Sequence, residues 1–184
     1  RNQTTIFSYA LKDGADAEIY QLISDICISM KAKDYLDLPE LIYEDIPVKL
    51  DNKAQKAYEQ MERDMLLEVE DDLVTATTAA TLTGKLLQLC NGAVYDEDGA
   101  VVPIHDCKLE AFMETVEQLN GQHALVFYNY QHDRDRILSA LAKTGLVVKV
   151  YKDAQDETDW NDGKIDILLA HPASCGYGLN LCTL

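Results

Sequence analysis

HALVFYNYQHDRDRILSALAKTGLVVKVYKDAQDETDWNDGKIDILLA, residues 123–170, is the stretch that decides the fold. It contains three apolar runs, each long enough for one buried strand: 123–128, 146–151 and 164–170. A helical pattern over 131–143 joins the first run to the second, and an acidic segment, in which we expect Trp160 to pin a short helix to the sheet, joins the second to the third. Strands and helices that alternate at these spacings predict a parallel, doubly wound α/β sheet.

The preceding residues predict a mainly helical region. A helix is expected after Asp106, its N-cap, and ends at Gly121. Residues 78–90 form another, closed by Asn91-Gly92, and a hairpin that turns at Asp98-Gly99 follows it. Asp51 is the expected N-cap of one long helix that frays over 68–72. The apolar stripe of this helix consists of Ala54, Tyr58, Met61, Met65 and Val69.

The start of the chain predicts a segment that links larger parts. A helical pattern covers residues 17–26, and LIYEDIPVKL (41–50) alternates like an extended strand with Pro47 near an edge or bulge. The fold class is therefore α/β. We divide the chain into a linking segment over 1–50, a helical region with a small hairpin over 51–104, and an α/β lobe over 105–184.

The charge of the chain disfavours an independent nucleic-acid module. Sixteen Lys and Arg stand against 32 Asp and Glu, which gives a formal net charge of −16. Free-standing nucleic-acid modules usually carry a basic patch or stripe, so any DNA contact here has to be local and few in number. The acidic runs 68–72 and 153–162 are expected to be solvated faces.

The five cysteines indicate a reducing compartment. They are scattered, without a C-x-x-C pair or zinc spacing, so we expect mostly buried thiols and a cytoplasmic protein. His132 and His171 are expected to approach each other at adjacent strand ends, but without a third ligand no metal site is predicted. No apolar run approaches the ~20 residues of a membrane span.

Two stretches at strand ends are candidates for function. In AHPASCGYGLNL (170–181), Gly176 and Gly178 allow a backbone to approach a phosphate closely, and a tight structural turn is the alternative interpretation. In VFYNYQ (126–131), aromatic and amide side chains lie at the end of the first strand. The alternative interpretation is that Phe127 belongs to the core and the other side chains to the plain surface. Both stretches are expected to face one crevice, where open α/β sheets bind ligands.

Five segments, in order, resemble the C-terminal half of the Swi/Snf-type ATPases of helicase superfamily II, most of all the compact phage and prophage versions. LDLPELIYEDIPVKLDNKAQKAYEQM (36–61) resembles the family's LP-to-Q-x-x-x-Y stretch, and LLQLCNG (86–92) its L-R-Q-I-C-N-H helix end. CKL (107–109) resembles the entry into the second RecA-like lobe, ALVFYNYQHDRDRI (124–137) motif IV, and LLAHPASCGYGLNL (168–181) motif V.

The resemblance implies a DNA-dependent, ATP-driven motor whose second lobe is present here in part. It implies an interlobe ATP cleft at Gly176, Gly178, Leu179 and Asn180, and contacts to the DNA backbone from Tyr128, Asn129, Gln131 and Ser174. No catalytic residue is assigned within the chain. ATP and Mg²⁺ belong to the intact parent, and neither is expected to be bound by the fragment, because no phosphate-binding G-x-x-x-x-G-K-[ST] loop occurs. The partners implied are DNA and the missing N-terminal lobe of the same protein.

Two departures from the family pattern bear on this interpretation. Ser29 and Met30 stand where the family usually has two arginines. The arginine-rich motif VI would follow residue 184 and the first lobe would precede residue 1, so we expect a fragment of a longer motor that is inactive as an ATPase alone. The alternative is a small acidic α/β interaction domain whose glycine loop is purely structural.

Overall fold

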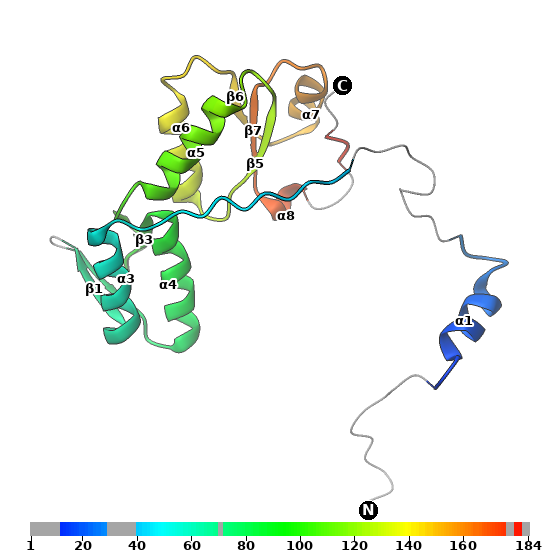
Figure 1. Ribbon diagram of the computed structural model, residues 1–184, viewed down its shortest axis with the longest axis horizontal. Helices are drawn as coiled ribbons and strands as arrows, with labels where there is room; N and C mark the ends of the chain where they lie inside the picture. The colour runs from blue at the N-terminus through cyan, green and yellow to red at the C-terminus, as the bar shows by residue number, and fades with distance from the viewer. Residues whose placement is uncertain (1–11, 29–39, 70–71, 176–178, 182–184) are drawn as a thin grey trace, which may run out of the picture. The chain divides into compact units, whose positions relative to one another are not determined.

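The computed structural model describes residues 12–28, 40–69, 72–175 and 179–181, which fall into two compact units, Arg1–Asp45 and Ile46–Leu184 (Figure 1). In the first unit, helix α1 (Ala15–Ile23) follows Gly14, which adopts a left-handed conformation with φ of +80°. The helix confirms the pattern expected over 17–26, and none of its residues is buried.

The α/β fold predicted for the last third of the chain is confirmed. Three strands, β5 (Ala124–Phe127), β6 (Val148–Val150) and β7 (Ile167–Ala170), form a parallel sheet in the order β5-β7-β6. Helices α5 (Cys107–Gln118), α6 (Gln131–Leu141), α7 (Ala154–Asn161) and the short α8 (Pro172–Cys175) alternate with them. This arrangement is compatible with a partial RecA-like lobe.

The sheet is the middle of three layers. Ile167 and Leu169 of β7 pack with α5 and α6 on one face, and Leu168 packs with Trp160 of α7 on the other. Every residue of β7 is buried because this strand is central and covered on both faces. Trp160 is 3% exposed and pins α7 to the sheet as predicted.

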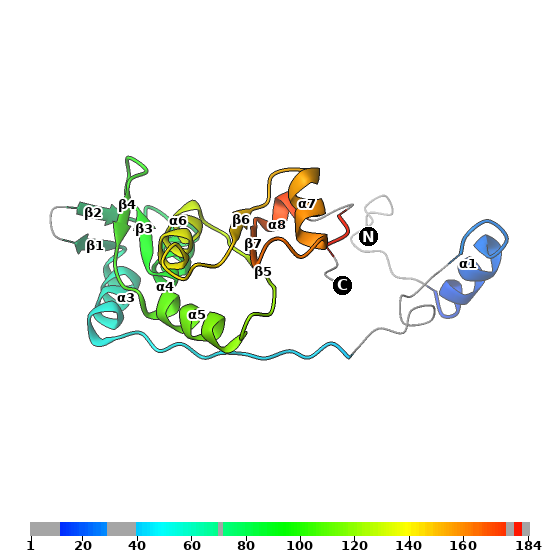
Figure 2. The same cartoon turned by 90° about the horizontal axis from the view of Figure 1, so that it is seen from above.

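A second core lies in the preceding region. Helices α3 (Asn52–Asp64) and α4 (Ala79–Asn91) pack with two antiparallel hairpins, β1 (Leu66–Val69) with β2 (Asp72–Thr75), and β3 (Ala93–Tyr95) with β4 (Val101–Pro103). Figures 1 and 2 show them together at one end of the unit. Met61, Leu67, Leu89, Val94 and Val102 meet in this core. The helix over 78–90 and the hairpin at Asp98-Gly99 are confirmed.

The long helix predicted over 51–72 is wrong in its second half. Asp51 caps α3 as expected, its carboxylate accepting from the Ala54 N–H at 2.7 Å. The helix ends at Asp64 because Met65 turns left-handed, with φ of +56°, and Leu66–Val69 then pairs with Asp72–Thr75. Of the predicted stripe, Ala54 and Met61 are buried, and Tyr58 and Met65 are partly buried against the same core. Leu67 of the hairpin, which lies outside the stripe, is buried in this core as well.

Two smaller expectations also fail. Residues 40–50 form neither helix nor strand, because no strand of the described residues pairs with this alternating segment. Its large apolar side chains are exposed except Leu50, which packs partly buried against the core of the helical region. Asp106 precedes α5 but makes no capping hydrogen bond, since its carboxylate accepts instead from Arg136 Nη2 at 2.7 Å.

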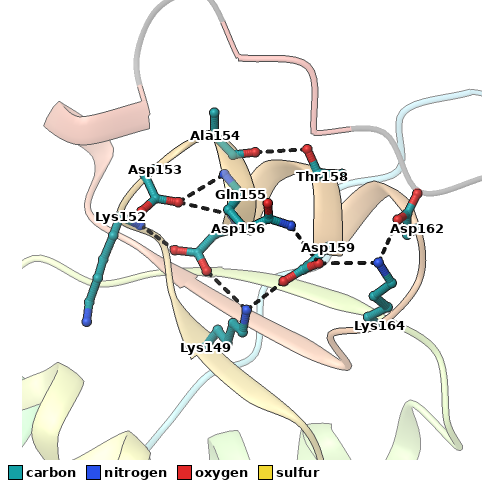
Figure 3. A network of polar contacts seen from close by, with 10 residues as sticks. All are labelled: Lys149, Lys152, Asp153, Ala154, Gln155, Asp156, Thr158, Asp159, Asp162 and Lys164. Carbon is teal, nitrogen blue, oxygen red and sulfur yellow. Dashed lines mark hydrogen bonds and ion pairs between the residues drawn. The ribbon is translucent and has the colours of Figure 1, made fainter.

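The acidic run around α7 is more than a solvated face (Figure 3). Asp153 caps the helix by accepting from the N–H groups of Gln155 and Asp156. Lys149 Nζ on β6 lies 2.8 Å from Asp159 Oδ2 and 3.3 Å from Asp156 Oδ1. Asp156 is 9% exposed and accepts the Lys152 N–H as well. Two of the acids therefore fix α7 to the neighbouring strand.

Replacing Asp159 tests this link. The hydrogen bond from Lys149, followed by that from Gln155, lowers the pKa of Asp159. A carboxylate whose folded pKa is lowered stabilises the fold above its unfolded pKa of about 3.9 and loses this effect as pH falls. Asp159→Asn should lower the urea midpoint at pH 7 and have less effect near pH 3. Asp162→Asn is the control because, among the described residues, the Asp162 carboxylate pairs with the exposed Lys164, the weaker partner of Asp159, and not with Lys149. Equal loss at both pH values in Asp159→Asn would contradict the prediction.

Removing residues 1–45 should leave the remaining fold intact. No residue of α1 is buried, and both cores lie within Ile46–Leu184. We expect residues 46–184 to unfold within about 2 °C of the full chain in thermal denaturation followed by circular dichroism, a shift of under about 1 kcal/mol for this size. A much lower midpoint would show that the first unit stabilises the second.

Candidate functional site

The carboxyl edge of the parallel sheet brings the two predicted stretches together. Phe127 of β5 is in register with Ala170 of β7, so the residues that follow both strands lie side by side. The Tyr128 N–H donates to the Ala170 carbonyl at 3.2 Å, and the Tyr128 ring meets the His171 ring edge-on, with centroids 5.7 Å apart. The expectation that the two stretches share one edge is confirmed for residues 126–131 and 170–175.

The other residues expected to contact DNA surround this point. Asn129 follows Tyr128, Gln131 is the first residue of α6, and Ser174 belongs to α8, where its N–H donates to the His171 carbonyl. All three are exposed. Tyr128 is partly buried against the core between the sheet and α5 and α6.

The glycine loop is only partly described. Gly176 and Gly178 lie outside the described residues. Asn180 is exposed; its N–H donates to Glu157 Oε1 at 3.0 Å and its carbonyl accepts from Asn161 Nδ2 at 2.8 Å. Leu179 is partly buried, and Leu181 packs on the Trp160 cluster. Residues 179–181 are thus held against α7.

The histidines and cysteines correct two expectations. His171 packs on Tyr128, whereas His132 is buried and packs against Tyr95 and Tyr130, with ring centroids 5.0 and 5.2 Å away. Each histidine of the expected pair thus contacts tyrosine rings instead. No cluster of three potential metal ligands occurs within the described residues. Mostly buried thiols were expected, but Cys27 and Cys90 are exposed; Cys90 lies off the apolar side of α4.

Cys175 lies beside the glycine loop. Burial raises the pKa of its thiol, which therefore stays protonated and poorly nucleophilic near neutral pH.

A pocket that the sequence did not predict opens beside Tyr128. It has a volume of about 170 Å³ and lies between the end of β5 and helices α5 and α6. Leu109, Phe112, Val126 and Ile137 contribute apolar groups to its lining. Polar groups surround them: Asn91, Lys108, Asn129, Asp133 and Arg136. Lys108 and Asn91 lie within segments that carried the family resemblance, but nothing in their spacing shows that α4, α5 and α6 converge here.

Asn91, at the end of α4, is the centre of the polar side of this pocket. Its Nδ2 donates to Asp133 Oδ2 at 2.8 Å, and its Oδ1 accepts from Lys108 Nζ at 2.7 Å. Its carbonyl accepts from Arg136 Nη1 at 2.6 Å. These bonds connect the helical region to both helices that cover one face of the sheet.

Gly92 allows this connection to form. Its φ is +104°, and a Cβ built on it would lie 2.3 Å from the His105 carbonyl oxygen and 2.5 Å from Arg136 Nη2. The same guanidinium donates to the His105 carbonyl at 2.5 Å. His105 is itself buried, and its Nε2 lies 2.8 Å from the Leu89 carbonyl; burial lowers its pKa, which favours the neutral ring. The chain turns back on itself here with no room for a side chain.

Comparison with known proteins shows similarity to a phage protein. Over 168 residues, 91% of this chain, the sequence is 39% identical to a protein of Acyrthosiphon pisum secondary endosymbiont phage 1 named "Putative protein p41". The chain spans about a third of that protein's length, 36%. No protein-family model matches the sequence. No helix of the described residues is long and apolar enough to cross a membrane.

Gly92→Ala should destabilise the fold strongly. Both the positive φ and the clash with a backbone oxygen oppose a methyl group, and we expect a loss of about 2–4 kcal/mol in the free energy of unfolding. Gly99→Ala is the matched control: its φ is +83°, but open space surrounds its Cβ position, so about 1 kcal/mol should be lost. Urea denaturation measures both, and equal losses would show that Gly92 is not sterically constrained.

Proposed function

We propose that this chain is part of an ATP-dependent DNA translocase or helicase of the Swi/Snf type. It contributes part of the second motor lobe, which closes on ATP and holds the DNA backbone. The observation that carries the proposal is the meeting of the motif IV-like and motif V-like segments at one sheet edge, with Tyr128 against His171. Open α/β sheets bind their ligands at this edge.

The exposure of the candidate DNA contacts supports this assignment. Asn129, Gln131 and Ser174 present amide and hydroxyl groups at the edge, and such groups bind phosphate oxygens without reading sequence. The contacts are few and uncharged. That suits a chain of net charge −16, which cannot hold DNA through a broad basic surface.

The first unit supports the view that further protein covers this chain. Large apolar side chains there are highly exposed, for example Tyr20 at 67%, Ile26 at 83%, Ile42 at 82% and Tyr43 at 85%. Such side chains are available for contact with another protein. We assign this contact to the other motor lobe of the same protein, which would hold most of the ATP and its Mg²⁺. The chain alone is then inactive as an ATPase, and its parent acts in the cytoplasm.

The gene on both sides of this segment provides the direct test. Upstream sequence should encode a phosphate-binding glycine loop and an acidic magnesium box, and downstream sequence an arginine-bearing motif. In the intact protein, Gln131→Ala and Ser174→Ala should each lower DNA-stimulated ATP hydrolysis about tenfold, because each removes one phosphate contact. Steady-state phosphate release with and without DNA measures the effect.

Gln118→Ala and Ser139→Ala are the matched controls. Both residues are exposed, Gln118 at the end of α5 and Ser139 on α6, and neither lies at the sheet edge. Their variants should retain full DNA stimulation. A reading frame without the upstream loop, or equal activity in all four variants, would overturn the proposal and favour an acidic interaction domain.

A further inference from the structure

We infer that the pocket between β5, α5 and α6 binds a single unpaired nucleobase together with its phosphate. The pocket itself stands on its own geometry. The identification of a DNA strand as the source of the base rests on the proposed function; a free nucleotide presents the same chemistry.

The size and walls of the pocket fit one flat ring system. Its volume of about 170 Å³ lies below the ~300–1,000 Å³ of sites for larger ligands. Aromatic residues from two elements, Phe112 of α5 and Tyr128 after β5, line it together with Val126 and Ile137. Val126 and Tyr128 pack with α5 and α6. Phe127 lies between them in sequence, is exposed, and also contributes to the pocket lining. Aromatic lining of this kind stacks on the face of any base.

The polar groups suit the edge of a base. Asn129 lines the pocket, is exposed, and its side-chain amide bonds to no other group in the described part of the chain. An amide offers one acceptor and two donors, the combination found on the edges of nucleobases. Asp133 is 9% exposed, and its Oδ2 accepts from Asn91 Nδ2 and from the Tyr130 N–H, so its carboxylate is fixed in place.

Lys108 provides a cation for the phosphate of the nucleotide. It lines the same pocket, and its Nζ donates one hydrogen bond, to Asn91 Oδ1, which leaves donors for an anion. Arg136 is committed to the Asn91 and His105 carbonyls and to Asp106. Lys108 is therefore the group that would meet the phosphate, with the base inserted toward Phe112 and Tyr128.

The proposed pocket can bind a base only when the base is not stacked on its neighbours. Inside a duplex the faces of the bases are covered, so the pocket accepts a base only from a single strand, a distorted duplex or a free nucleotide. This adds contact with a base to the backbone contacts expected for Tyr128 and Asn129.

Binding by the full chain at low salt tests the inference. Fluorescence anisotropy would compare a labelled single strand of about 12 nucleotides with the same strand in which the bases are replaced by abasic sites, leaving the phosphates. The strand with bases should bind about tenfold more tightly, because base stacking on an aromatic residue contributes on this scale. Deoxyadenosine monophosphate and inorganic phosphate serve as competitors.

Variants locate the effect. Tyr128→Leu keeps an apolar side chain but should abolish the preference for bases, and Lys108→Gln should weaken both strands alike. Tyr151→Leu is the control, because Tyr151 packs on the opposite face of the sheet; it should keep the preference. Circular dichroism establishes that each variant is folded.

The outcomes separate the two proposals. Equal binding of intact and abasic strands, a preference that survives Tyr128→Leu, or no binding of any strand or nucleotide would overturn the base pocket, whatever the gene encodes. Competition by the nucleotide but not by phosphate, with no binding of the strand, supports the pocket and assigns it to a free nucleotide. A base preference in a chain whose gene lacks a motor lobe supports the pocket while the proposed function fails.

Discussion

The guanidinium of Arg136 holds this structure together. From α6 it donates to the carbonyls of Asn91 and His105 and pairs with Asp106, so one side chain satisfies the end of α4 and the entry into α5. Arg136 is 18% exposed, and carbonyls left without a donor at such a place are costly to bury. The helical region and the α/β layers each have a core of their own, and this junction fixes how one core stands against the other. Because the pocket is lined by residues of both regions, its shape depends on the same junction.

The elements that the sequence predicted well are those in which local chemistry and tertiary packing agree. The three apolar runs form three parallel strands, of which the central β7 is buried throughout and the outer β5 and β6 are partly buried. The Asp51 cap and the turn at Gly92 follow from the preferences of single residues. The prediction of a single helix over 51–72 is wrong where local chemistry and tertiary packing disagree. Met65 continues the apolar spacing, but the pairing of Leu66–Val69 with Asp72–Thr75 overrides it, and such pairing is invisible to periodicity.

The candidate site could be predicted from the sequence only in part, because some of its contacts depend on how the helices pack. That 126–131 and 170–175 meet follows from topology, because the carboxyl ends of neighbouring parallel strands share an edge. Tyr128 could be named from its place at the end of the first strand together with the motif IV resemblance. Asn91, Lys108 and Asp133 could not be grouped, since they lie on three different helices and their hydrogen bonds depend on how these helices pack. The acids of α7 show the same limit: Asp156 and Asp159 look like solvent-facing charges in sequence, and Lys149 on β6 binds them.

The net charge of the chain affects the binding of phosphates and the binding of bases at the candidate site differently. At a net charge of −16, every phosphate that approaches does so against the long-range field, and only local cations such as Lys108 oppose it. A base is uncharged, so its transfer into an apolar pocket meets no such opposition and gains from contact with aromatic rings. A protein of this charge that acts on nucleic acid therefore gains more from holding the face of a base than from adding phosphate contacts. Under the proposed function, this constraint favours a small aromatic pocket beside exposed amide groups, at the sheet edge where the two family-like segments meet.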